Sequence, residues 1–323
     1  MAKGNNDTAA LIIAFLVTAG LLVGGGVWFF KGKLFRPLDG TSDPTARSSA
    51  TPQNSTNPTT VPALETSQPN PAVLTMDGSV TMVALMKQFQ LAYTQVNPSL
   101  QTTYGLPDGN PNGTNTGIRN LIDGKALITA SSRPLKPNEY QAGLQAIPIA
   151  KDALAVVVGL NNPYKGGLTS QQLKQIFQGK ITNWSQVGGP ALPIKVINRS
   201  SDSGTYTFFK DVVLFEQSFA PDGPNFTTAR QDETTPLLQQ LGRNGITYST
   251  VQQVEKQRTV RIVPIDGLLP TDQTAIQNGT YPLGRVLYLA VPKQISPAVK
   301  QFIDMTLSPR GQQVVQRVGF LPL

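Results

Sequence analysis

Residues 198–209, NRSSDSGTYTFF, join an apolar run to a helical pattern through a loop of small hydroxyl residues. The apolar run before the loop, 194–197, has the composition of a buried strand. After the loop a helix is expected to begin, with Asp202 or Ser203 as a suitable N-cap. A strand that leads directly into a capped helix is the repeating unit of α/β folds. Capping gives no reason for Arg199.

The same alternation of strands and helices continues from residue 73 to the C-terminus. Further strands are predicted at 72–76, 126–129, 153–158 and 285–291. The helix starts have recognisable caps: Thr169 with Gln172 forms a capping box, and Ser296-Pro297 and Ser308-Pro309 each place Pro after a Ser cap. One helix is predicted from apolar residues at helical spacing, namely Met82, Leu85, Met86, Phe89 and Tyr93. We therefore predict an α/β fold with functional residues at the carboxyl ends of strands.

The composition excludes several kinds of chemistry. The chain of 323 residues contains neither Cys nor His, so it has no disulfide, no thiolate nucleophile, no Cys-based metal site and no Ser-His-Asp triad. It also lacks the phosphate-loop, dinucleotide-binding and nucleophile-elbow motifs. We predict no catalytic residue, no metal site and no cofactor.

The formal net charge is +8, with the basic residues spread along the chain. A spread charge favours a small anion over nucleic acid as the partner. It is equally compatible with a basic soluble protein that binds no anion.

The first 72 residues differ from the rest. Residues 11–30 are uncharged and mostly apolar, which is the length needed to cross a bilayer. We predict a membrane anchor in 1–37, with a transmembrane helix at about 9–30; the alternative is a cleaved signal peptide. Residues 38–72 are rich in Pro, Ser, Thr and Asn, which predicts a disordered linker. A tethered domain is then expected at 73–323.

Two strand-to-helix junctions share a design that suits an anion. DGSVTM at 77–82 and NRSSDSGT at 198–205 each place Gly and hydroxyl residues at a helix start. Unpaired backbone N–H groups and the helix dipole attract negative charge there. Arg199 adds a planar fork that binds two oxygens of a tetrahedral oxyanion. The residues alone leave open whether these junctions bind an anion or only cap their helices.

An ordered series of segments resembles the periplasmic phosphate-binding proteins of ABC transporters. The segments are 77–82, 115–139, 147–159, 168–189, the Arg-x-x-x-Ser-Gly-Thr of 199–205, 242–250, 281–291 and 308–315. The resemblance implies a two-lobed type II periplasmic-binding-protein fold with a hinge. Lobe 1 is then expected at about 73–152 and 286–323, and lobe 2 at about 153–285.

The same resemblance implies the binding residues. Phosphate is expected to contact Ser79, Thr81, the Met82 backbone, Thr114 and Ser132 in one lobe, and Arg199, Ser203, Gly204 and Thr205 in the other. Arg133 is a further candidate, either as extra positive charge or as a salt-bridged surface residue. Two positions depart from the family: Ser132 stands where some members have Asp, which accepts the proton of hydrogen phosphate, and Val80 replaces a second Ser. These departures leave open whether the ligand is phosphate or sulfate.

The implied function is that of a non-enzymatic, membrane-anchored protein in the periplasm or another extracytoplasmic space. It would deliver phosphate to the permease subunits of an ABC transporter and bind no nucleic acid. Three alternatives stay open: a membrane-tethered phosphate sensor, a scaffold that reuses the fold without binding, and a phosphoester hydrolase.

Overall fold

The computed structural model describes residues 62–323. The predicted anchor, the helix at 9–30 and most of the predicted linker lie outside the described residues. Within 62–323, no helix is both long enough and apolar enough to cross a membrane.

A nine-stranded mixed sheet runs through this part of the chain in the order β3-β2-β4-β10-β5-β8-β6-β7, with β9 paired to β5. Every strand predicted from the sequence is present. The strands are β2 (Val73–Gly78), β3 (Gln101–Tyr104), β4 (Ile128–Ser131), β5 (Leu144–Gly159), β6 (Lys195–Asn198), β7 (Phe226–Thr228), β8 (Gly245–Thr250), β9 (Val260–Val263) and β10 (Gly284–Pro292).

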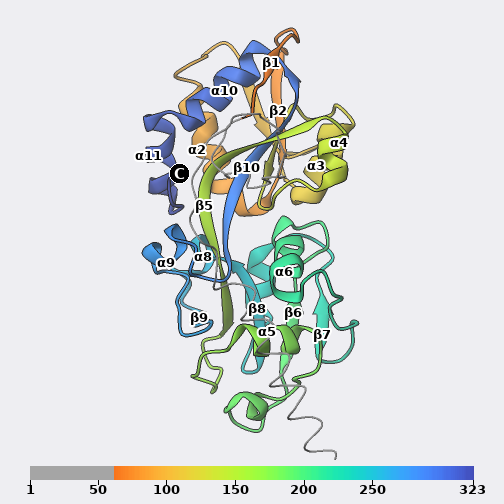
Figure 1. The fold of residues 1–323 in the computed structure, drawn as a ribbon, viewed down its shortest axis with the longest axis vertical. Helices are drawn as coiled ribbons and strands as arrows, with labels where there is room; N and C mark the ends of the chain where they lie inside the picture. The colour runs from red at the N-terminus through yellow and green to blue at the C-terminus, as the bar shows by residue number, and fades with distance from the viewer. Residues whose placement is uncertain (1–61) are drawn as a thin grey trace, which may run out of the picture. The chain divides into compact units, whose positions relative to one another are not determined.

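Strands β5 and β10 lie side by side and connect the two halves of the sheet (Figure 1). They pair antiparallel from Ala153 with Gly284 to Leu144 with Pro292, and β5 then continues alongside β8. At 16 residues, β5 is roughly 50 Å long. The apolar pattern predicted only 153–158, because Pro148 and the charged residues Lys151 and Asp152 interrupt it, whereas the family resemblance covers 147–159. The pairing shifts by a residue next to Pro148, where a bulge accommodates the missing N–H.

Two hydrophobic clusters divide the described residues into two lobes. Lobe 1 is built on the cluster that includes Leu74, Phe89 and Phe302, and lobe 2 on the cluster that includes Trp184, Phe209 and Tyr248. Along β5, Ala150 belongs to the first cluster and Ala153 to the second. Leu287 of β10 and Leu283, just before β10, divide in the same way. The chain therefore passes between the lobes at Asp152 and Arg285.

The helices cover the two halves of the sheet, and their starts carry the predicted caps. Thr169 and Gln172 form their capping box, and Ser296 and Ser308 each accept a backbone N–H. The apolar residues predicted for the first helix are all fully buried. In lobe 1 lie η1 (Val80–Met82), α2 (Val83–Tyr93), α3 (Thr114–Ile122), α4 (Pro137–Gln141), α10 (Pro297–Leu307) and α11 (Pro309–Val318). In lobe 2 lie α5 (Ser170–Phe177), η2 (Trp184–Val187), α6 (Gly204–Leu214), α7 (Thr234–Gln239), α8 (Val251–Val254) and α9 (Gln273–Gln277).

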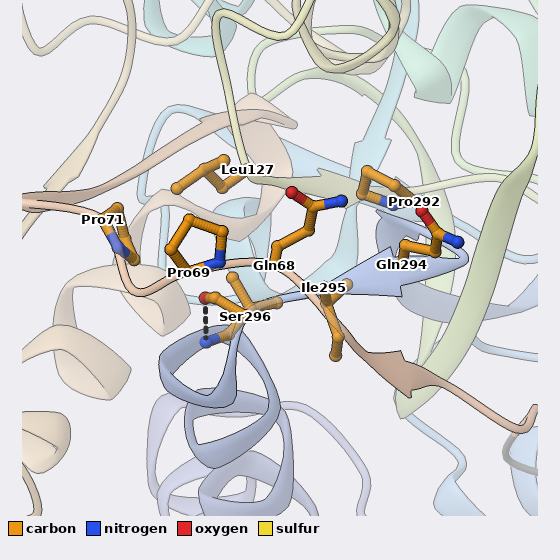
Figure 2. Close-up of a pocket in the computed structure, with 9 residues that line it drawn as sticks. Gln68, Pro69, Pro71, Leu127, Pro292, Gln294, Ile295 and Ser296 are labelled. Carbon is orange, nitrogen blue, oxygen red and sulfur yellow. Dashed lines mark hydrogen bonds between the residues drawn. The ribbon is translucent and has the colours of Figure 1, made fainter.

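The segment before β2 packs against lobe 1. Strand β1 (Glu65–Thr66) pairs in parallel with β11 (Gln294–Ile295), and the Asn70 side chain accepts a hydrogen bond from the Ala298 N–H at 2.8 Å. Figure 2 shows Gln68, Pro69 and Pro71 lining a pocket of about 380 Å³ together with residues of β11 and the start of α10. The linker predicted at 38–72 therefore extends too far at its C-terminal end. Residues 65–70 are held against lobe 1 by pairing with β11 and by the Asn70 hydrogen bond, which composition does not reveal.

Candidate functional site

The predicted site residues follow the carboxyl ends of parallel strands. β2 and β4 run parallel in lobe 1, as do β6 and β8 in lobe 2. Ser79 follows β2, Ser132 follows β4 and Arg199 follows β6, and all three side chains are buried. Ligands of α/β sheets bind at such strand ends, so the topology brings the predicted residues to one place.

At the first junction, Ser79 does not cap its helix. Gly78 has φ of 121°, and a Cβ there would lie 2.3 Å from the Ala130 carbonyl oxygen, so only glycine fits. The Ser79 backbone is fixed by its N–H to Ala130 at 2.9 Å and by the Tyr104 hydroxyl, which donates to its carbonyl at 2.6 Å. Its side chain makes no capping hydrogen bond. Capping therefore does not account for this serine.

The Met82 backbone, predicted as a ligand contact, has a different role. Its N–H donates to the Ser79 carbonyl at 3.1 Å, because the chain turns here as a 3₁₀ helix that closes three residues apart. The Met82 side chain is fully buried in the core of lobe 1. The structure thus uses this N–H inside the turn.

Thr114 and Ser132 lie against each other at the start of α3. The Thr114 Oγ1 accepts the Ser132 N–H at 3.2 Å and lies 3.3 Å from the Ser132 Oγ. Both side chains are fully buried. This pair places two hydroxyl groups beside the first backbone N–H groups of a helix.

At the second junction, Ser203 is both a cap and a polar group of the cleft. Its Oγ accepts the Thr205 N–H at 3.2 Å and the Arg199 Nε–H at 3.1 Å. Because both bonds use the oxygen as acceptor, the hydroxyl proton is left to donate to a third group. Capping and binding are therefore compatible at this residue.

The Arg199 guanidinium is held entirely within lobe 2. Its Nη2 donates to Asp232 Oδ1 at 2.5 Å, and Nη1 lies 3.2 Å from Thr234 Oγ1 and 3.4 Å from Ser249 Oγ. The exposed fraction of the side chain is 1% for Arg199 and 3% for Asp232. Nη2 carries two N–H groups and donates to one acceptor among residues 62–323. One N–H is therefore available to an anion.

Arg133 is neither a surface residue nor an additional charge facing the cleft. Its donors all have protein acceptors: Nε and Nη2 on Asn115, Nη1 and Nη2 on Glu139, and Nη1 on the Pro134 carbonyl. Burial disfavours the ionised form of Glu139, but hydrogen bonds from Arg133 and the Lys136 N–H outweigh it and hold the pKa of Glu139 below its usual value. The structure thus confirms the salt bridge of the second alternative but not its surface position, since Arg133 is buried and its donors all have protein acceptors.

The two lobes touch each other across this site. Thr81 Oγ1 and Thr205 Oγ1 are 3.1 Å apart. Asn115 donates its N–H to the Asp202 carbonyl at 3.0 Å and its Nδ2–H to the Ser201 carbonyl at 2.8 Å. The structure therefore represents a closed arrangement of the cleft.

Gly204 lies tightly against residues of lobe 1. A Cβ at this glycine would lie 2.3 Å from Thr114 Oγ1 and 2.6 Å from Ser132 Oγ. Gly204 is the first residue of α6 and Thr114 the first of α3, so two helix N-termini meet here. Each helix start contributes a positive dipole end and backbone N–H groups that lack an intrahelical acceptor; of these, the Asn115 N–H already donates to Asp202 and the Thr205 N–H to Ser203.

Three buried charged residues of the cleft were absent from the sequence-based prediction. Asp232 pairs with Arg199, and Asp152 pairs with Arg285. Burial lowers the pKa of Arg285, and the Asp152 carboxylate opposes that shift. Asp152 interrupts the apolar run 147–159, which was a usable signal, because a charge inside a buried strand requires a partner.

The chain matches a family described as the PBP superfamily domain over residues 64–310. Among curated proteins, it is 32% identical to the phosphate-binding protein PstS of Pseudomonas aeruginosa, over 76% of this chain and 81% of that protein. It is 30% identical to PstS of Borreliella burgdorferi, over 79% of this chain and 91% of the relative.

Solved structures give the same picture of the fold. A substrate-binding protein from Clostridium perfringens, whose structure contains bound phosphate, matches with a TM-score of 0.68 and 29% identity, over 78% of this chain and 99% of that one. An ABC-type phosphate transport receptor from Vibrio cholerae matches with a TM-score of 0.65 and 26% identity, over 77% of this chain and all of its own. The two-lobed type II architecture expected from the sequence is thus confirmed for the described residues.

Proposed function

The chain belongs to the PBP superfamily and is a relative of phosphate-binding proteins, and from that premise we propose that it binds inorganic phosphate in the cleft between its lobes. It then delivers the anion to the permease subunits of an ABC transporter. The support is the identity to PstS proteins over most of both chains. On the same support we propose that it binds without turnover, since these relatives are named for binding.

The observation that carries this proposal is the convergence of hydrogen-bond donors at Gly204. The N-termini of α3 and α6 meet there, with the hydroxyls of Thr114 and Ser132 within contact distance. Arg199, Arg285 and Arg133 each have a buried carboxylate partner, so these ion pairs are neutral as a set. An anion added to the cleft is then stabilised by helix dipoles, neutral donors and the one available N–H of Arg199.

The proposed contacts come from both lobes. They are Ser79, Thr81, Thr114 and Ser132 in lobe 1, and Arg199, Ser203, Gly204 and Thr205 in lobe 2, all buried in the closed arrangement. We leave out Met82, whose N–H is used in the 3₁₀ turn. Arg133 acts indirectly, by holding Asn115 where it bonds the other lobe.

We propose lobe boundaries close to those expected from the sequence. Lobe 1 comprises about 73–152 and 286–323 together with the packed segment 62–72, and lobe 2 comprises about 153–285. The two hydrophobic clusters and the crossing of β5 and β10 support this division. Hinge closure about the crossing would enclose the anion and exclude water from it.

We also propose that residues 9–30 anchor the chain in the membrane, with the domain on the extracytoplasmic side. The support is the apolar run at 11–30 and the similarity to proteins whose names refer to phosphate ABC transport. The linker would then let the domain reach its permease.

Calorimetry of the full chain with phosphate and with sulfate tests this function. We expect phosphate to bind, and the Kd for sulfate to be within about 100-fold of the Kd for phosphate. The reason is that a serine at 132 favours a protonated anion less than a carboxylate acceptor would. Binding of neither anion would refute the proposed function. A preference for phosphate far above that ratio would show that another group accepts its proton.

Ser79→Ala is expected to weaken phosphate binding about tenfold, since one neutral hydroxyl donor worth roughly 1.4 kcal/mol is lost. The backbone of Ser79 is held by Ala130 and Tyr104, so the junction keeps its shape. Ser218→Ala, an exposed serine of lobe 2, is the matched control and is expected to bind normally. Titration calorimetry measures both; a loss larger than that of an Arg199 variant would mean that the dominant contact has been misplaced.

A further inference from the structure

Asp152 and Arg285 form an ion pair where the chain crosses between the lobes. They are direct register partners on β5 and β10. Arg285 Nε and Nη2 lie 2.8 and 2.7 Å from Asp152 Oδ2, and neither side chain is exposed. The other carboxylate oxygen of Asp152 accepts the Thr250 hydroxyl at 2.6 Å. The guanidinium is thus fixed at the hinge itself, independently of either lobe's helices.

From this position Arg285 reaches both lobes. Nη1 donates to the Ser132 carbonyl of lobe 1 at 3.1 Å and to Thr205 Oγ1 of lobe 2 at 3.0 Å. Nη2 lies 3.4 Å from Thr81 Oγ1 of lobe 1. Nε also donates to Asp152 and Nη2 is ion-paired with it, so each nitrogen of the guanidinium contacts an oxygen of the described residues. Because these contacts are all with groups of the protein, they indicate that Arg285 positions those groups.

The contacts of Arg285 determine how two proposed ligand hydroxyls point. Thr81 and Thr205 accept from the guanidinium, so neither hydroxyl proton can point toward Arg285. One of the two protons is shared in the 3.1 Å contact between these residues. The other is left to donate to a group other than the guanidinium. Because the two hydroxyls come from different lobes, this arrangement exists only when the lobes are closed.

We propose that Arg285 is a positioning residue, which turns the Thr81–Thr205 pair into a hydrogen-bond donor toward the anion and so links anion binding to closure of the lobes. This inference rests on the proposed function, in which both threonines contact phosphate. Arg285 acts through the two hydroxyls and leaves the anion itself to the groups around Gly204.

The test measures phosphate binding to the full chain by calorimetry, for the wild type, Arg285→Lys, Thr205→Val and the double variant. Arg285→Lys keeps the charge and a partner for Asp152, so the hinge stays paired, but an ammonium has three donors and no planar fork, so it cannot bond Asp152, the Ser132 carbonyl and both threonines together. We expect Arg285→Lys to raise the Kd for phosphate about 20-fold in the wild-type background. In the Thr205→Val background we expect the same substitution to raise the Kd by less than about threefold, because the effects of coupled residues are not additive. Small-angle scattering with inorganic phosphate is expected to show incomplete closure of Arg285→Lys.

The outcomes separate this inference from the proposed function. Wild-type affinity in Arg285→Lys, or an equal loss in both backgrounds, would overturn the inference, since charge alone would then suffice. Binding of phosphate by the wild type in that case leaves the proposed function intact. Absence of binding by the wild type overturns both. The neutral pair Asp152→Asn with Arg285→Gln serves as a second variant, expected to fold and to bind as weakly as Arg285→Lys.

Discussion

Replacing Arg199 by alanine is expected to raise the Kd for phosphate about a thousandfold. Two effects add. The anion loses a charge-assisted hydrogen bond, worth about 1.5–3 kcal/mol, from the Nη2 group that has one N–H available. The Asp232 carboxylate, buried and no longer neutralised, then repels the anion. A total of roughly 4 kcal/mol corresponds to three powers of ten in affinity.

Calorimetry on Arg199→Ala needs controls for charge and for folding. Arg119→Ala removes the same charge from another arginine at the lobe contact, but its pair with Asp202 is exposed by 60% and 40%, so we expect less than a fivefold change in Kd. An unpaired buried Asp232 costs about 3–5 kcal/mol of stability. Arg199→Ala with Asp232→Ala removes that charge as well, and its affinity is expected to recover only in part.

An Arg199→Ala variant that binds phosphate as tightly as the wild type would place the anion elsewhere. Equal losses for Arg119→Ala and Arg199→Ala would show that overall charge, and not the buried fork, governs affinity. Either result leaves the fold assignment untouched.

Local patterns in the sequence predicted the elements well. A capping box, such as Thr169 with Gln172, is a signal within four residues, and the structure confirms it. The helical spacing from Met82 to Tyr93 likewise predicted a buried face. The apolar pattern alone was insufficient for β5. Asp152 lies inside the apolar run of this strand and interrupts the pattern from which a strand is predicted.

Partners distant in the sequence could not be predicted. Ser79 and Ser203 occupy similar junctions, yet only Ser203 caps its helix, because the Ser79 junction begins with a 3₁₀ turn. Arg133 and Arg199 were both candidates for the anion. Their hydrogen-bond partners differ. Asn115, Glu139 and the Pro134 carbonyl accept from every N–H of Arg133, whereas Asp232 accepts from Arg199 Nη2 and leaves one of its N–H groups.

Gly204→Ala is expected to raise the Kd for phosphate about 100-fold while leaving the unliganded protein at least as stable. The added Cβ would lie 2.3 Å from Thr114 Oγ1 and 2.6 Å from Ser132 Oγ, both in the opposite lobe. Overpacking of this kind costs up to roughly 3 kcal/mol. In Gly204→Ala this cost arises only when the lobes close, so the unliganded protein avoids the clash by keeping the lobes apart. Within lobe 2, alanine at the first residue of α6 is a better helix former than glycine.

The substitution is therefore expected to weaken closure of the lobes and not the folding of the protein. Calorimetry of phosphate binding and thermal unfolding of the unliganded protein distinguish the two effects. Gly223→Ala is the matched control, because it makes the same substitution in lobe 2 where a Cβ meets no atom within 4 Å. Small-angle scattering is expected to show the wild type and Gly223→Ala contracting with phosphate, and Gly204→Ala contracting less. Full contraction and wild-type affinity in Gly204→Ala would mean that the anion is held with the lobes further apart than this closed arrangement, and the donors around Gly204 would then not all reach it at once.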